Sequence, residues 1–125
     1  MTGQQIYETA SAFLYEKDNE DADSKTFAVN FLNVLLQEAL PYENAVRRRA
    51  GKEQLETAPV LTDLTEQIDY CDQITRAALP YGLASWYFQE ALDNFQAENY
   101  RSKYLAALDD ARKHFNGTVE DVYGW

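Results

Sequence analysis

Apolar side chains recur along much of the chain every three or four residues, which is the spacing of one face of an α-helix. The first such segment covers residues 4–16, with Ile6 on its apolar face and Thr2 placed to cap its start. A polar and acidic loop is expected to follow it. The pattern predicts a short amphipathic helix at the beginning of the chain.

A second helix is expected over residues 25–40, with Asp23 or Ser24 as its N-cap. Apolar residues cover most of its circumference, which indicates a central position in the fold. Pro41 is expected to break or kink this helix, after which helical residues can resume as far as Gly51. Its apolar residues are Phe27, Ala28, Phe31, Leu32, Val34, Leu35, Leu36, Ala39 and Leu40.

Residues 52–68 carry no long helical stripe, so we expect an irregular loop across the domain surface with at most a brief strand. A third helix is expected to begin at Asp69 or Asp72 and to run to Leu92. Pro80 lacks a backbone donor and is expected to kink this helix in the turn before it. Small residues should let another helix approach closely there, namely Ala77, Ala78, Gly82 and Ala84.

The fourth helix is expected to run from Asp93 or Asn94 to His114. Its expected apolar face comprises Phe95, Tyr100, Tyr104, Leu105, Leu108, Ala111 and Phe115. Together these elements predict an all-α fold, a compact bundle of about four helices with one long irregular loop and an extended C-terminal tail. The expected organisation is a helical domain over residues 1–115 and a tail over residues 116–125.

The composition and net charge of the chain indicate which kinds of molecule it is not expected to bind. The chain has 125 residues, is 46% hydrophobic and carries a net charge of −10. It is long and apolar enough for one domain with its own core. The acidic balance disfavours nucleic-acid binding and an anionic membrane surface. Without a spanning apolar run or the layout of a signal peptide, the chain is expected to be made in a cytoplasm.

No group of residues indicates catalysis. His114 is the only histidine and is expected to act as a cation at a helix C-terminus. Cys71 is the only cysteine and is expected to be structural and half-buried. A calcium loop starting at Asp18 would need Gly where Asp23 stands and Glu where Val29 stands. We therefore expect no enzyme, no cofactor and no metal site.

Four phrases, in their order and spacing, resemble the head–tail connector proteins (adaptor or head-completion proteins) of tailed bacteriophages. They are QQIYETASAFLYE, FLNVLLQEALPYENAVRRRAG, APVLTDLTEQIDYCDQITRAALPYGLASWYF and VEDVYGW. The third is the most specific, because an extended P-x-L phrase precedes a polar stretch and then a helix carrying ALPYGLA. The resemblance covers most of the chain.

This resemblance implies a structural virion protein of the head–tail interface, made in the cytoplasm of the bacterial host. It implies a ring, usually of twelve subunits, that assembles on the portal protein, extends the DNA channel and gives tail-completion proteins a docking surface. DNA would pass without sequence-specific binding, and an acidic lumen would keep the duplex from adhering. No membrane is involved.

The resemblance also implies contact residues. The C-terminal segment would dock on the portal, with a tail folded back on its own domain as the alternative; the docking residues would be Val119, Val122, Tyr123 and Trp125. A head-to-tail ring needs two complementary patches on each subunit. We expect the cations Arg47, Arg48 and Arg49 to meet the acids Asp18, Asp21 and Asp23 of the next subunit.

Two alternatives stay open. The three arginines can instead be solvated cations that a helix C-terminus favours, or bind a phosphate or an acidic partner. Loop 52–68 packs on a neighbouring subunit or forms part of the channel, or else is a mobile surface loop. The competing function is a small acidic helical regulator that occupies a basic groove of a protein partner.

Overall fold

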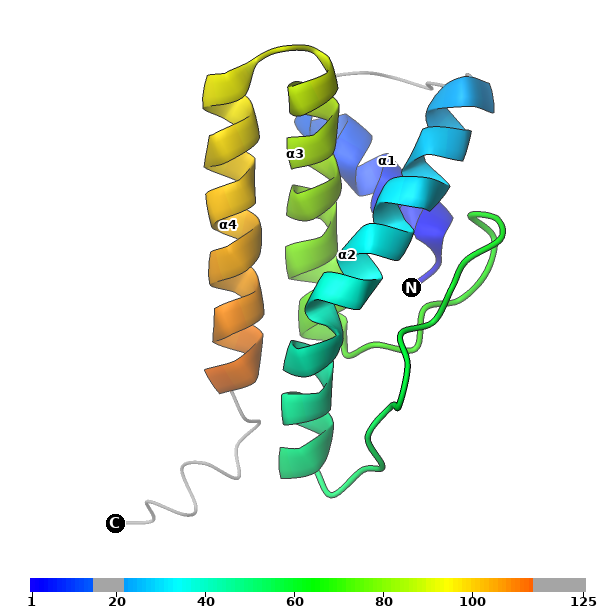
Figure 1. The fold of residues 1–125 in the computed structure, drawn as a ribbon, viewed down its shortest axis with the longest axis vertical. Coiled ribbons are helices and arrows are strands. Elements are labelled where there is room, and N and C mark those ends of the chain that lie inside the picture. The colour runs from blue at the N-terminus through cyan, green and yellow to red at the C-terminus, as the bar shows by residue number, and fades with distance from the viewer. Residues whose placement is uncertain (15–21, 114–125) are drawn as a thin grey trace.

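The computed structural model describes residues 1–14 and 22–113, without the side chains of residues 22 and 23. Within these residues the chain forms four α-helices, one π-helical turn and no β-strand. They are α1 (Gly3–Phe13), α2 (Ala22–Arg49), η1 (Gln73–Ala78), α3 (Leu79–Glu90) and α4 (Asn94–Lys113). The helices α3 and α4 stand side by side, α2 crosses α3, and α1 packs behind them (Figure 1). The predicted all-α helical bundle with one long irregular loop is confirmed, and the predicted tail lies outside the described residues.

The first helix begins where the sequence predicts. The Thr2 hydroxyl accepts a hydrogen bond from the Gln5 backbone at 3.2 Å, and the Gln5 side chain accepts one from the Thr2 backbone at 2.9 Å. This reciprocal pair satisfies two backbone donors at the helix start. The helix ends at Phe13, short of the predicted residue 16, because the Leu14 N–H bonds to the Ser11 carbonyl only three residues back.

The second helix runs unbroken for 28 residues from Ala22. The prediction of Asp23 or Ser24 as its N-cap is wrong, because the helix already includes both residues. Ser24 is buried and accepts a hydrogen bond from the Tyr7 hydroxyl at 3.3 Å. Pro41 does not break the helix, although its axis changes direction near the middle (Figure 1). The donor that Pro41 lacks would have bonded to the Gln37 carbonyl, and both residues are exposed, so water can pair with that carbonyl.

The third helical segment starts at Asp72, one of the two predicted positions. The disturbance expected before Pro80 takes the form of the π-helical turn η1, in which the Leu79 N–H bonds to the Ile74 carbonyl five residues back. One extra residue in the turn accommodates the donor that proline cannot supply. The position of the disturbance was therefore predicted correctly, and the structure shows that it is a π-helical turn.

The turn between α3 and α4 corrects two expectations. The third helix ends before Leu92, which has a φ of 61° in the left-handed region and reverses the chain. Asp93 then caps α4 by accepting a hydrogen bond from the Gln96 backbone at 3.1 Å. Phe95 was expected in the core but is 78% exposed. It precedes the buried Tyr104 by about two and a half helical turns, which places it on the opposite face of α4.

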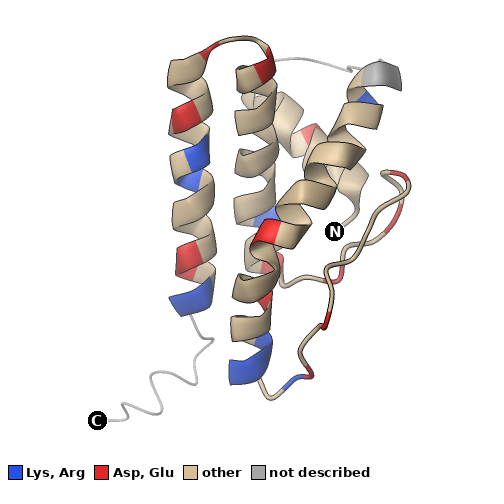
Figure 2. Ribbon diagram, in the orientation of Figure 1, with Lys and Arg blue, Asp and Glu red and all other residues tan. Residues whose placement is uncertain are grey.

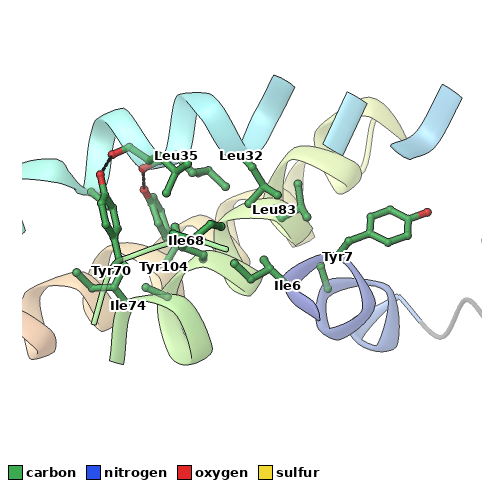
Figure 3. Close-up of a cluster of buried hydrophobic side chains, with 14 of the residues drawn as sticks. Ile6, Tyr7, Leu32, Leu35, Ile68, Tyr70, Ile74, Leu83 and Tyr104 are labelled. Carbon is green, nitrogen blue, oxygen red and sulfur yellow. Dashed lines mark hydrogen bonds between the residues drawn. The ribbon is translucent and has the colours of Figure 1, made fainter. Parts of the chain in front are cut away.

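The core lies where α2, α3, α4, α1 and the long loop meet (Figure 3). Tyr70 and Tyr104 reach across it, and their hydroxyls donate to the carbonyls of Leu36 and Leu35 at 2.6 and 3.4 Å. Burial raises the pKa of both phenols, so both hydroxyls stay protonated donors. A Cβ on Gly82 would lie 2.8 Å from a Leu35 methyl carbon and 2.9 Å from the Tyr104 ring. The predicted close approach of helices at a small residue is confirmed here.

The long loop packs on its own domain instead of merely crossing its surface. Leu61, Leu64 and Ile68 are buried in the core. The brief strand considered at residues 59–61 does not form, and Gln67 makes a single antiparallel bridge with Thr2. The loop is therefore a structural part of the bundle.

Two asparagines of α2 hold the loop backbone. The Asn33 side chain donates to the Leu61 carbonyl at 3.0 Å and accepts from the Leu61 N–H at 2.7 Å. Asn44 makes the same pair of bonds with Leu55, at 2.9 and 2.8 Å. An amide side chain offers one donor and one acceptor side by side. Each asparagine can therefore pair with both backbone groups of one loop residue, as a neighbouring β-strand would.

We expect Asn33→Ala and Asn44→Ala each to lower the free energy of unfolding by about 1–2 kcal/mol, because each leaves a partly buried backbone donor and acceptor unpaired. The two effects should add, since the sites are three helical turns apart. Urea unfolding measures the total, and amide hydrogen exchange should accelerate at Leu55 or Leu61. Asn30→Ala, at an exposed position of the same helix, is the control. Equal effects at Asn30 and Asn33 would contradict the assignment.

A short turn in the loop depends on an ionised carboxylate. Glu66 accepts hydrogen bonds from the Thr62 hydroxyl, from the Thr62 N–H at 2.6 Å and from the Asp63 N–H at 3.0 Å. These bonds, the hydroxyl bond first, hold the pKa of Glu66 below its ordinary value of 4.5. The ionised form therefore stabilises the turn above that value, and its contribution is lost as the pH falls through the folded-state pKa.

We therefore expect Glu66→Gln to be less stable than the parent chain at neutral pH, with the difference shrinking below a pH of about 4.5. Thermal unfolding over a series of acidic buffers measures this. Glu56→Gln, an exposed loop position, should follow the parent chain throughout. A difference that stays constant with pH would show that the Glu66 charge does not matter.

Candidate interaction surfaces

A buried ion pair joins α2 to both ends of the long loop. Glu43 is 3% exposed, and its carboxylate accepts from the Arg47 Nε at 2.6 Å and from the Cys71 N–H at 2.7 Å. Arg47 also donates to the carbonyls of Asp69 at 2.6 Å and Glu53 at 3.3 Å. Because each polar group is paired with another, this cluster works as a structural clamp on the loop.

The thiol beside this clamp is protected. Cys71 is half-buried, as predicted. Burial, before any other cause, raises the pKa of its thiol, so little reactive thiolate forms at neutral pH. The adjoining cavity has a volume of about 90 Å³, room for little more than water. Within residues 1–14 and 22–113, no three His, Cys, Asp or Glu side chains gather where they could hold a metal ion.

The structure separates the three arginines predicted to contact a neighbouring subunit. Arg47 belongs to the buried clamp, whereas Arg48 and Arg49 are exposed at the end of α2. Arg49 donates to the Lys113 carbonyl at 3.2 Å, which brings the end of α4 alongside. Together with Arg112, these cations form the basic end of the bundle (Figure 2), defined as Arg48, Arg49, Arg112 and Lys113.

The structure does not describe the side chains of the three aspartates that were predicted to contact these arginines. Asp18 and Asp21 lie outside the described residues, and Asp23 lies in the first turn of α2 without a described side chain. At the end of the bundle away from the arginines, Glu90 and Asp93 flank the turn between α3 and α4 (Figure 2). The contact between charge clusters therefore stays a prediction.

The predicted docking residues of the tail also lie outside the described part of the chain. Val119, Val122, Tyr123 and Trp125 all lie outside the described residues, as does His114 with its predicted capping role. Their assignment remains a prediction.

A groove lies between α2 and α4, above the ion pair that joins them. Arg101 donates two hydrogen bonds to the Glu38 carboxylate, at 3.0 and 2.6 Å, and this pairing raises the pKa of Arg101. Trp86 of α3 lies beside the pair and stacks on Phe31 with ring centroids 5.0 Å apart. The resulting hollow has a volume of about 500 Å³. We call it the α2–α4 groove.

Sequence periodicity missed an exposed apolar stripe of α2 that adjoins this groove. Phe27 and Val34 were expected in the apolar stripe of a central helix, but they are 51% and 46% exposed. The Nε1 atom of Trp86 is buried without a hydrogen-bond partner among the described residues, an arrangement that costs about 1–3 kcal/mol. No sequence signal distinguishes an apolar residue that faces the core from one that faces a groove.

Fold and surfaces together define the class of this protein as an all-α bundle with charged ends and a groove lined mainly by polar side chains. Comparisons with protein-family models, with curated proteins and with solved structures found no match for the chain. Among the helices that the structure describes, none is both long enough and apolar enough to cross a bilayer.

Proposed function

We propose that the chain is a structural head–tail connector of a tailed bacteriophage or prophage. It assembles as a ring between the portal and the tail and extends the DNA channel. The observation that carries the proposal is the order and spacing of the four sequence phrases that resemble this family. On this proposal the protein is part of the virion and is not an enzyme.

The arrangement of the two longest phrases supports this proposal. One covers most of α2, and the other covers η1 and most of the loop and of α3. They are joined by the bonds of Asn33 to Leu61, of Cys71 to Glu43, and of a loop tyrosine to an α2 carbonyl. Phrases that form one packed unit give the resemblance a structural basis, because residues that pack together constrain one another.

The charge distribution gives further support. The basic end and the acidic turn between α3 and α4 lie at opposite ends of the bundle (Figure 2). A head-to-tail assembly needs two different, complementary patches on each subunit. The ring then leaves the C-terminal segment, with Tyr123 and Trp125, to dock on the portal as aromatic anchors.

The test is electron microscopy of the full chain mixed with the portal protein encoded in the same gene cluster. The expected result is an added ring on the portal with the rotational symmetry of the portal. Mass spectrometry of purified virions should detect the chain. Absence of binding to the portal, together with a small complex of fixed stoichiometry with another protein, would instead favour an acidic helical regulator.

Charge reversal tests the predicted contact between subunits. Arg48→Glu with Arg49→Glu should weaken ring assembly on the portal at least about tenfold, because like charges would face each other. Arg48→Glu alone keeps the bond of Arg49 to the end of α4 and separates assembly from stability. Lys103→Glu, an exposed position along α4, makes the same charge change away from the basic end and is the control. Intact assembly of the double variant would refute this contact.

A further inference from the structure

The α2–α4 groove has the shape of a helix-binding site. Above the Glu38–Arg101 pair, α2 leans away from α4 and α3 lies between them (Figure 1). The lining comes from all three helices and includes Glu38, Trp86, Gln89, Ala97, Glu98 and Arg101. A hollow bounded by helices accepts another helix by packing side-chain ridges into grooves.

An apolar stripe of α2 adjoins this groove, because one of its rings stacks on Trp86, which lines the groove. Phe27, Phe31 and Val34 recur at spacings of four and three residues, so they share one face of α2. Phe27 stacks on Phe31 with ring centroids 6.2 Å apart, and Phe31 stacks on Trp86 at 5.0 Å. The rings form a continuous aromatic surface that is half exposed to water at Phe27. Such a surface marks a contact site.

The charged residues around the groove indicate the charge of the molecule that it would bind. Arg101 is the cation that lines it, and Glu38 neutralises that cation through two hydrogen bonds. Glu98 lines the same hollow, and Glu90 and Asp93 are the sequence neighbours of its lining residues Gln89 and Asn94. The excess charge is negative, so a cationic occupant is favoured.

We propose that the α2–α4 groove and the adjoining apolar stripe of α2 together bind an amphipathic helix of a partner protein. Its aliphatic or aromatic residues would pack against Phe27, Val34 and Trp86, and its Lys or Arg residues would lie beside Glu98. The acidic C-terminal segment of this chain, with Glu120 and Asp121, is disfavoured by like charge. A second copy is disfavoured by its net charge of −10. The proposal does not depend on the connector function.

The probe is a fluorescein-labelled synthetic helix of about 18 residues, or five turns, with leucines at i, i+3, i+4 and i+7 and lysines elsewhere. Fluorescence anisotropy with the full chain should give a Kd of roughly 10 μM. Two further peptides serve as controls. One has the same composition in an order without an apolar stripe, and the other replaces each lysine by glutamate. Both should bind at least about tenfold more weakly.

Matched variants of the chain locate the site. Val34→Lys should weaken binding of the cationic peptide at least about tenfold, because it removes an apolar contact and adds a like charge. Val60→Lys makes the same change at an exposed loop position and should stay within about twofold. Glu98→Lys and the loop variant Glu56→Lys form a second pair with the same expectation. Circular dichroism should show unchanged helicity in all four variants, because all four positions are exposed.

Three results would overturn the proposal. Equal binding of the three peptides would show that neither stripe nor charge matters. Equal effects within each pair of variants would place the binding elsewhere. Sedimentation of the chain alone that reveals a dimer abolished by Val34→Lys, with no peptide bound, would make a second copy the occupant.

Discussion

Replacing Tyr104 with alanine is expected to lower the free energy of unfolding by about 3–5 kcal/mol, the largest effect of any substitution considered for this protein. The Tyr104 ring is fully buried. It fills the space between α2 and α4 that Gly82 leaves open, and its edge lies next to the position where a Cβ on Gly82 would be. Alanine would leave a cavity that the neighbouring helices cannot close without separating. Urea unfolding followed by circular dichroism measures the loss.

Two further variants show which part of Tyr104 matters. Tyr104→Phe keeps the ring and removes the hydroxyl, whose contacts with the Leu35 carbonyl and with Glu38 are long, at 3.4 Å each. We therefore expect a loss of about 1 kcal/mol or less. Phe95→Ala truncates an exposed ring on the same helix and should change stability by no more than about 0.5 kcal/mol. If Tyr104→Ala cost no more than Phe95→Ala, the described packing of α4 would be wrong.

Glu43→Ala should have the second largest effect, a loss of about 2–3 kcal/mol in the free energy of unfolding. It removes the acceptor for Arg47 and for the Cys71 N–H and so releases both ends of the loop. The estimate lies below the usual cost of breaking a buried pair because Arg47 keeps 14% of its side chain exposed and can turn towards water. Urea unfolding measures the loss, and amide exchange at Cys71 should accelerate.

The controls for this prediction separate charge from hydrogen bonding. Glu43→Gln keeps an acceptor for the Cys71 N–H and loses the charge that pairs with Arg47. It should lie between the parent chain and Glu43→Ala. Arg48→Ala removes the neighbouring exposed cation and should change stability by no more than about 0.5 kcal/mol. A loss of similar size in Arg48→Ala and Glu43→Ala would mean that the clamp contributes little.

Sequence patterns placed Tyr104 on an apolar helix face, but they did not select the residues that hold the loop. Glu43 and Tyr70 looked like an ordinary polar position and an ordinary loop residue, yet one anchors the loop and the other donates to the Leu36 carbonyl. Each interaction joins positions separated by 28 residues or more. Local spacing contains no information about such pairs, because it describes which residues share a face and not which faces meet.

The candidate contact surfaces were only partly open to prediction. The exposure of Arg48 follows from its position in the last turn of a helix, where cations are favoured. The separate role of Arg47 depends on a carboxylate one turn away being buried under the loop. The exposure of Phe27 and Val34 and the groove beside Glu38 depend on how α2 lies against α3 and α4, which is a property of the assembled bundle.

The amino-acid sequence by itself determined the helical class, the start of α1 at Thr2, the disturbance before Pro80 and the start of α4 at Asp93 or Asn94. These features follow from hydrogen-bonding chemistry between residues a few positions apart. Only the tertiary structure decided that α2 passes Pro41 without a break, that the loop enters the core and that Phe27 and Val34 of α2 are exposed. These features depend on contacts between distant segments, whose energies outweigh the local preferences of each segment.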